Sequence, residues 1–255
     1  MRQSSILEYR SNRRTRKKNQ RKGQTKRNSN HKCISQRDPR LPCHCHNSLN
    51  KPCRAERIPG SLFCPNHQTC KGSPLSGWEP LYDPDRYNKD LMTQETHNCF
   101  AYGMNVLDPS QLTQCVGKPK CDLHYHQPGG TVGLSSVLDK ASGRSCKVVE
   151  RLMRYDVPEI RRTTFRKKCP VGTSKIALVA HRGEDYHFYR QDRDGMWSHK
   201  DGANPVKRYD ARGEPIFNPE RAARNYRPKG SFLNYSDFCG LYCVPRNKTL
   251  QLAQG

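Results

Sequence analysis

The chain has 255 residues, with 46 lysines and arginines against 23 acidic residues and a formal net charge of +23. Its hydrophobic fraction is 33% and its mean hydropathy is −1.01, so part of the chain does not belong to an apolar core. No stretch reaches the roughly 18 consecutive apolar residues of a membrane-spanning helix. The basic N-terminus has no apolar segment of the kind found in secretory signals, and we expect none. The 13 cysteines then indicate reduced thiols, metal ligands or a catalytic thiol rather than a disulfide framework.

About half of the excess positive charge lies at the N-terminus. Residues 1–32 contain twelve lysines and arginines and one acid, a net +11, whereas the other 223 residues carry 34 bases and 22 acids, a net +12. Residues 10–32 include no Ile, Leu, Val, Phe or Trp, so apolar burial cannot offset the entropy lost on ordering. We expect a flexible arm that binds an acidic protein surface, nucleic acid or anionic membrane lipids, with a solubilising or nuclear-targeting tail as the alternative. Its anion-binding residues are Arg13, Arg14, Arg16, Lys17, Lys18, Arg21, Lys22, Lys26 and Arg27.

Residues 42–70 concentrate five cysteines and three histidines in 29 residues. Four of them have the spacing C-x7-C-x10-C-x2-H, which suits tetrahedral Zn²⁺: Cys45, Cys53, Cys64 and His67. Because the segment has almost no apolar core, the metal would supply much of its folding energy, as a structural ion with four protein ligands. Cys43 is an alternative to Cys45, Cys70 or His44 can compete, and free thiols in a loop are the metal-free alternative. The stretch resembles small Cys-Cys-Cys-His zinc modules of viral and eukaryotic proteins.

Other cysteines and histidines give weaker signals. Cys115, Cys121, His124 and His126 have a spacing that fits no metal module, and we expect core thiols and loop histidines there. Cys239 and Cys243 are four residues apart in a predicted strand, Phe238–Val244, which places them on the same face. We expect both to serve core packing.

A short helix is predicted from Cys99. Phe100, Met104 and Leu107 recur at helical spacing, Asn98 is a plausible N-cap, and Pro109 ends the pattern. This puts Cys99 in the first turn, where backbone N–H groups and the helix dipole lower the pKa of a thiol. The position is that of a nucleophile, with a buried core thiol as the alternative.

A β-meander is predicted further along the chain. Ser174–Ala180 is a short apolar strand, a turn leads into Asp185–Gln191, and a second turn leads into Met196–Lys200. His187 and His199 lie twelve residues apart on adjacent strands, so their imidazoles meet only in the right register. A short polar helix is expected at Pro219–Arg224.

The residues NCFAY and DYHFYRQD…WSHK resemble the papain-type cysteine-peptidase superfamily that includes NlpC-type and CHAP-type amidases. The resemblance implies an α+β fold with a papain-like antiparallel sheet and a helix that carries the nucleophile. It also implies Cys99 as nucleophile, His187 as general base and His199 as the group that orients it. The Phe100 that follows the cysteine and the long insert from Pro109 to Pro170 depart from the family's usual pattern.

A wider resemblance covers roughly Cys64–Lys248. The stretches ETHNCFAYGMNVLDP, HQPGG, CPVGTSKIALV and NYSDFCGLYCVPRNK are similar to a mostly uncharacterised protein family of large nucleocytoplasmic DNA viruses. It implies a viral origin, synthesis in the host cytoplasm and a place in the virion. We therefore expect a minor capsid or internal protein whose arm anchors it to neighbouring capsid proteins, nucleic acid or a membrane, with an active cysteine peptidase or amidase as the alternative. The expected parts are an arm (1–32), a zinc module (33–70), a connecting loop (71–94), the papain-like domain (95–250) and a tail (251–255).

Overall fold

The structure is a computed structural model that describes residues 42–46, 51–58, 61–67, 70–108 and 125–253. All of these belong to one unit, Asp38–Gly255. Its α-helices are α1 (Asp85–Asn88), α2 (Leu91–Thr96), α3 (Cys99–Met104) and α5 (Cys146–Asp156). Its 3-10 helices are η1 (Pro65–His67), η2 (Gly130–Val132), η3 (Ser135–Asp139), η4 (Ala141–Gly143) and η5 (Arg227–Lys229). Its strands are β1 (Arg161–Thr163), β2 (Thr173–His181), β3 (Asp185–Gln191), β4 (Trp197–Lys200), β5 (Val206–Lys207) and β6 (Asp237–Pro245).

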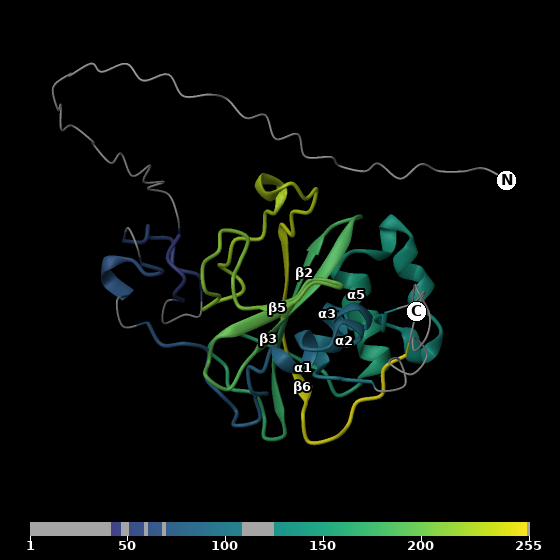
Figure 1. The fold of residues 1–255 in the computed structure, drawn as a ribbon. Coiled ribbons are helices and arrows are strands. Elements are labelled where there is room, and N and C mark those ends of the chain that lie inside the picture. The colour runs from purple at the N-terminus through teal and green to yellow at the C-terminus, as the bar shows by residue number, and fades with distance from the viewer. Residues whose placement is uncertain (1–41, 47–50, 59–60, 68–69, 109–124, 254–255) are drawn as a thin grey trace, which may run out of the picture. The chain divides into compact units, whose positions relative to one another are not determined.

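The strands form one antiparallel six-stranded sheet in the order β1-β6-β2-β3-β4-β5, so the fold is α+β (Figure 1). The predicted meander is confirmed as β2, β3 and β4, because tight turns join them, with Gly183 and Gly195 in the left-handed region (φ +85° and +88°). The predicted closing strand is β6, which pairs with β1 and β2. No helix among the described residues is long and apolar enough to cross a membrane.

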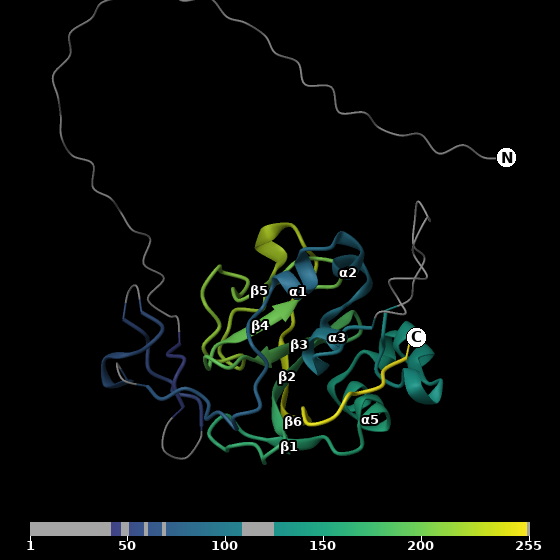
Figure 2. The same ribbon diagram turned by 60° about the horizontal axis from the view of Figure 1, so that its bottom comes forward.

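The two faces of the sheet carry different cover. On one face, α3 and α5 pack through Phe100, Met104 and Leu152 against apolar side chains of β2, β3 and β6 (Figure 2). On the other face, residues from extended segments such as Phe165, Ile216 and Tyr235 pack against Val179 and Trp197. The alternation of side chains along β2 supplies both faces, which explains why that strand is apolar from Ile176 to Ala180.

Helix α3 begins as predicted. The Asn98 side chain accepts hydrogen bonds from the backbone N–H groups of Phe100 and Ala101, both at 3.1 Å. The helix is shorter than its apolar pattern: it ends at Met104, where Asn105 takes a left-handed conformation (φ 61°). Pro109 therefore does not end it.

Three cysteine pairs among the described residues form disulfides, so the expectation of reduced thiols without a disulfide framework is wrong for them: Cys45–Cys70, Cys146–Cys239 and Cys169–Cys243. The fold brings together partners 25, 93 and 74 residues apart, which spacing along the chain does not reveal.

The prediction that Cys239 and Cys243 share one face of their strand is also wrong. Leu178 pairs with Gly240 but Val179 pairs with Phe238, so Cys239 is the extra residue of a β-bulge. Gly240 has φ +144° at this point, a conformation that favours glycine. As a result, Cys239 joins the helix-covered face, whereas Cys243, paired with Lys175, lies on the opposite face with Leu241.

Two other expectations change. Residues 219–224 form a turn rather than a helix, because Asn218 accepts from the N–H groups of Arg221 and Ala222, while Ala223 donates to the Asp210 carboxylate instead of continuing the turn. The connecting loop contains α1, and α2 begins within it.

Candidate functional site

The Cys/His segment, whose described residues are 42–46, 51–58, 61–67 and 70, is built from two short antiparallel pieces and one 3-10 turn. Backbone bridges join Pro42 to Glu56 and His46 to Pro52, so the pieces that carry Cys43 and Cys53 run side by side. Helix η1 follows Cys64, and its His67 N–H donates to the Cys64 carbonyl at 2.9 Å. The turn thus returns His67 toward the cysteine three residues before it.

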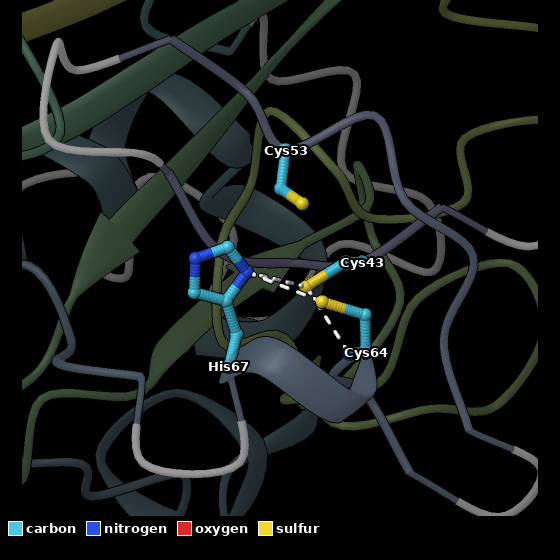
Figure 3. A group of neighbouring side chains, drawn as sticks. All are labelled: Cys43, Cys53, Cys64 and His67. Carbon is cyan, nitrogen blue, oxygen red and sulfur yellow. Dashed lines mark hydrogen bonds between the residues drawn. The ribbon is translucent and has the colours of Figure 1, made fainter.

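Four side chains converge there: Cys43, Cys53, Cys64 and His67 (Figure 3). Their ligand atoms all lie within 4.8 Å of one another. His67 Nδ1 is 3.2 Å from Cys64 Sγ and 3.8 Å from Cys43 Sγ. Ligands about 2.3 Å (sulfur) and 2.0–2.1 Å (nitrogen) from a tetrahedral zinc ion stand roughly 3.5 Å apart. The donor set and its spacing are therefore compatible with a metal ion.

The predicted ligand Cys45 is not part of this group, and its assignment is wrong. Cys45 is bonded to Cys70, with a Cα–Cα distance of 5.9 Å, and a disulfide sulfur is no thiolate ligand. Cys43 takes its place, the alternative that the sequence left open. His44 does not compete, because it lines a separate small cavity with Arg57 and Glu214.

Side chains of the sheet domain hold this segment by polar contacts. Arg57 makes a bidentate pair with Glu214 at 2.8 and 2.6 Å, and His46 Nε2 lies 2.7 Å from Glu220. Arg221 donates to the carbonyls of Cys43 and Cys53, at 3.3 and 3.2 Å. The turn that replaces the expected helix at 219–224 thus supplies Glu220 and Arg221, which make three of these contacts.

Cys99 lies at the N-terminus of α3 and is 7% exposed. Its Sγ is 4.0 Å from the Tyr186 carbonyl, and no hydrogen bond joins it to His187, although the structure describes both residues. Burial raises the pKa of the Cys99 thiol above its ordinary value, and the carboxylate of Asp185 adds to this shift. The helix terminus does not overcome the burial, so Cys99 is a neutral thiol at rest.

The register of the meander brings His187 and His199 together. Tyr189 pairs with His199, so His187 and His199 are diagonal neighbours on one face. His187 Nε2 lies 2.8 Å from His199 Nδ1. Both rings are buried, and the pKa of His187 falls to about 3 because burial disfavours its charged form.

Asp201 completes this group, and the sequence analysis missed it. Its Oδ1 lies 3.1 Å from His187 Nε2 and 3.0 Å from His199 Nδ1. The signal was present: Asp201 is two residues after His199, hence on the same face, and the register puts it opposite His187. Burial would raise the pKa of Asp201, but the facing His187, His199 and Lys207 hold it well below its usual range.

Cys99, His187 and Asp201 share one cavity of about 830 Å³. Four of its lining residues are acidic and one is basic: Asp139, Glu184, Asp185, Asp201 and Arg144. Although the whole chain is strongly basic, this cavity favours cations and positively charged groups.

Some expectations lie outside the described residues. These are the basic arm at 1–32 with all of its anion-binding residues, and Cys115, Cys121 and His124 of the weaker group. His126 is described: it is buried, and its Nε2 lies 3.2 Å from the Asp108 carboxylate.

Comparison with known proteins gives one informative match. No family model matches the chain, and no solved structure matches it. The insoluble matrix shell protein 1 of Ruditapes philippinarum is 30% identical over 165 residues, which cover 62% of this chain and 86% of the relative.

Proposed function

Because the chain belongs to the family of the insoluble matrix shell protein 1, we propose that it is a structural component of an insoluble protein assembly. The observation that carries the proposal is this membership. The architecture supports it, because disulfides tie α5 to β6 and Cys169 to the same strand, and a separate disulfide closes the Cys/His segment. Such covalent ties are typical of proteins that act in oxidising surroundings outside the cytosol.

The second element of the proposal is a structural Zn²⁺ ion held by Cys43, Cys53, Cys64 and His67. Three sulfurs and one imidazole nitrogen form the donor set of closed zinc sites, which leave no position open for a substrate. The segment has almost no apolar core of its own, since its buried cluster consists of cysteines packed with Phe63. Zinc would therefore fix the segment's fold.

The kind of assembly follows from two separate similarities. The relative's name favours an insoluble shell matrix, whereas the resemblance to proteins of large DNA viruses favours a virion. In both, residues 1–32 would anchor the chain to acidic partners, as their net charge of +11 predicts.

Fractionation of the source organism tests the structural role. Its cells, its extracellular material and any virus particles are extracted with detergent, and peptides of this chain are quantified by mass spectrometry in each fraction. We expect them in an insoluble fraction, from which a reductant together with a chelator releases more protein than either reagent alone. Recovery of the chain in the soluble cell extract would contradict the proposal.

A papain-type cysteine hydrolase is the second candidate, favoured by the cavity that Cys99 and His187 share. In this mechanism Cys99 Sγ attacks the carbonyl carbon of an amide while its proton moves to His187. The amine then leaves with that proton, and water hydrolyses the thioester to a carboxylic acid and the free thiol. Because Cys99 and His187 are both neutral at rest, the proton transfer must accompany the attack.

Labelling with iodoacetamide tests this candidate on the unreduced protein loaded with one equivalent of Zn²⁺, which protects the Cys/His cluster, with the modified peptide identified by mass spectrometry. We expect Cys99 to be modified, the signal to be absent in Cys99→Ala, and His187→Ala to slow it. The matched control is His181→Ala, which changes a partly exposed histidine of the neighbouring strand β2. A rate at Cys99 that is the same in His187→Ala and His181→Ala would rule out His187 as the base.

A further inference from the structure

Three ligand atoms meet at the end of the β3–β4 hairpin: His187 Nε2, His199 Nδ1 and Asp201 Oδ1. Their separations are 2.8, 3.0 and 3.1 Å, so they form a nearly equilateral triangle. Neither imidazole is exposed, at 2% and 0%, whereas the Asp201 side chain is 23% exposed. Three polar atoms so close together need either suitable hydrogens or a cation between them.

Hydrogens alone do not satisfy all three contacts. The Tyr209 carbonyl, 3.0 Å from His199 Nε2, can only accept, so that nitrogen carries the hydrogen. In the neutral ring Nδ1 then carries a lone pair, which is directed at the Asp201 carboxylate and at His187 Nε2. One N–H from His187 can serve both neighbours, but the lone pairs of His199 and Asp201 still face each other at 3.0 Å. A cation within the triangle removes this conflict.

We propose that His187, His199 and Asp201 bind a divalent transition-metal ion, with Zn²⁺ the best fit. Two imidazole nitrogens and one carboxylate oxygen are a common ligand set for this class of ion. Bonds of about 2.0–2.1 Å to these three atoms put the ion roughly 1 Å out of their plane. This site differs from the Cys/His cluster in having no sulfur ligand and only three protein ligands.

The surroundings have the features of a metal site. His199 donates its other ring N–H to the Tyr209 carbonyl, which fixes the ring orientation. The second carboxylate oxygen of Asp201 is held by an ion pair with Lys207. His187 and Asp201 also line the 830 Å³ cavity, so a fourth coordination position can face water or a substrate there. The neighbouring Asp185 and Glu184 increase the attraction for a cation.

This inference does not depend on the structural role, and it competes with the hydrolase candidate for one ring. A metal ion on Nε2 of a neutral His187 leaves the hydrogen on Nδ1. That nitrogen then cannot accept the proton of Cys99, so metal binding would suppress thiol chemistry in the cavity. Zinc would therefore slow the alkylation of Cys99.

Zinc stoichiometry and affinity test the proposal on the full chain. The protein is stripped with a chelator, titrated with Zn²⁺ in a competing chelator, and measured by calorimetry and mass spectrometry of the metal. We expect two ions per wild-type chain and one in His199→Ala, with the remaining ion still held by the Cys/His cluster. Cys64→Ser should also bind one ion, and the control His181→Ala should bind two.

A gentler variant guards against misfolding of His199→Ala. Asp201→Asn keeps the shape of the side chain and one acceptor oxygen but removes its charge, and we expect it to weaken zinc binding at this site by about 10-fold or more. Co²⁺ provides a separate readout, because the Cys64→Ser protein should give a spectrum without the strong thiolate bands that the Cys/His cluster would produce. An unchanged stoichiometry and affinity in both His199→Ala and Asp201→Asn, with the fold intact by circular dichroism, would overturn the proposal.

Discussion

The Cys/His segment and the sheet are stabilised in different ways. The buried cluster of the segment is made of cysteines, with Phe63 as its one aromatic neighbour among the described residues. The sheet has apolar side chains packed on both faces, among them the fully buried Phe188 and Trp197. The free energy gained by burial scales with the apolar area removed from water, so the sheet can fold through the hydrophobic effect, whereas the segment needs a metal ion.

The Cys/His segment and the sheet therefore have separate requirements for folding, although they belong to one unit. Polar pairs such as Arg57–Glu214 join the segment to the sheet, but each carboxylate is partly exposed, so these pairs are modest contributors. Loss of the metal should therefore loosen the segment without unfolding the sheet. Four experiments challenge this separation, beginning with the largest effect.

Metal removal should have the largest effect, and it should be local. Structural zinc contributes on the order of 10 kcal/mol to the folding of small zinc domains. Cys64→Ser, which removes the metal from the Cys/His cluster alone, should abolish amide-exchange protection of residues 51–58 and 61–67 and leave that of β2 and β3 unchanged, as measured by hydrogen exchange with mass spectrometry. Cys99→Ser is the control. Equal loss of protection in both regions would show that they fold together.

Truncation of a buried aromatic ring should destabilise the sheet and leave the Cys/His segment unchanged. Phe188 is fully buried, with its ring centroid 5.4 Å from that of Phe100 and 5.8 Å from that of Tyr186. Phe188→Ala should lower the free energy of unfolding by about 3–5 kcal/mol, measured in urea, without changing zinc affinity at the Cys/His cluster. Phe232→Ala, at a ring that is 66% exposed, should change it by less than about 0.5 kcal/mol.

Removal of the disulfide between α5 and β6 should have the next largest effect on stability. Removing the Cys146–Cys239 link by replacing both residues with alanine frees a loop with a sequence separation of 93, which should cost about 2–4 kcal/mol. The measurement is thermal unfolding of the zinc-loaded protein, with and without a reductant. Reduction breaks this disulfide in the wild type as well, so the unfolding temperatures of the two proteins should lie closer together with the reductant than without it. The unfolding temperature of the double variant should fall less on reduction, because it has one disulfide fewer to lose. A wild type that reduction does not destabilise would contradict the disulfide's role.

The smallest effect should come from the partly buried Glu150 carboxylate and its ion pairs, and it should depend on pH. Arg162, Tyr242 and Arg154 bond to Glu150 and lower its pKa to about 2 although burial opposes this shift. A depressed pKa adds stability above the unfolded value of about 4.5 and loses it as the pH falls toward 2. Glu150→Gln should therefore cost about 1–3 kcal/mol at pH 7 and almost nothing near pH 2.

Urea unfolding at several pH values measures this difference. The exposed Glu184→Gln is the control, and its cost should stay below about 0.5 kcal/mol at pH 7. A Glu150→Gln penalty that persisted undiminished at pH 2 would mean that lost packing, rather than lost charge, causes it.

The sequence predicted those parts of the fold that local pattern determines. Apolar and turn residues alternate clearly enough to define β2, β3 and β4, and Asn98 marks the start of α3. Helix α5 was missed within a long insert, although Val149, Leu152 and Met153 follow helical spacing. Partners distant in the chain, such as Cys45 and Cys70, could not be inferred because pairing depends on the completed fold.

The candidate sites were predictable to the same degree. Three of the four residues in the Cys/His cluster were identified, and the choice between Cys43 and Cys45 depended on a disulfide that spacing does not reveal. The proximity of His187 and His199 depended on register, which a turn of unknown geometry sets. With the register known, Asp201 follows directly as the residue opposite His187.

The bulge at Cys239 has a mechanical consequence. It turns two cysteines of one strand to opposite faces, so β6 is tied to α5 on one side and to Cys169 on the other. Since β6 lies inside the sheet, between β1 and β2, tension applied to either covering layer passes into an interior strand through a covalent bond. Neither covering layer can therefore separate from the sheet without pulling on β6. In a load-bearing material, the domain would resist stretching until backbone hydrogen bonds on both sides of β6 broke together.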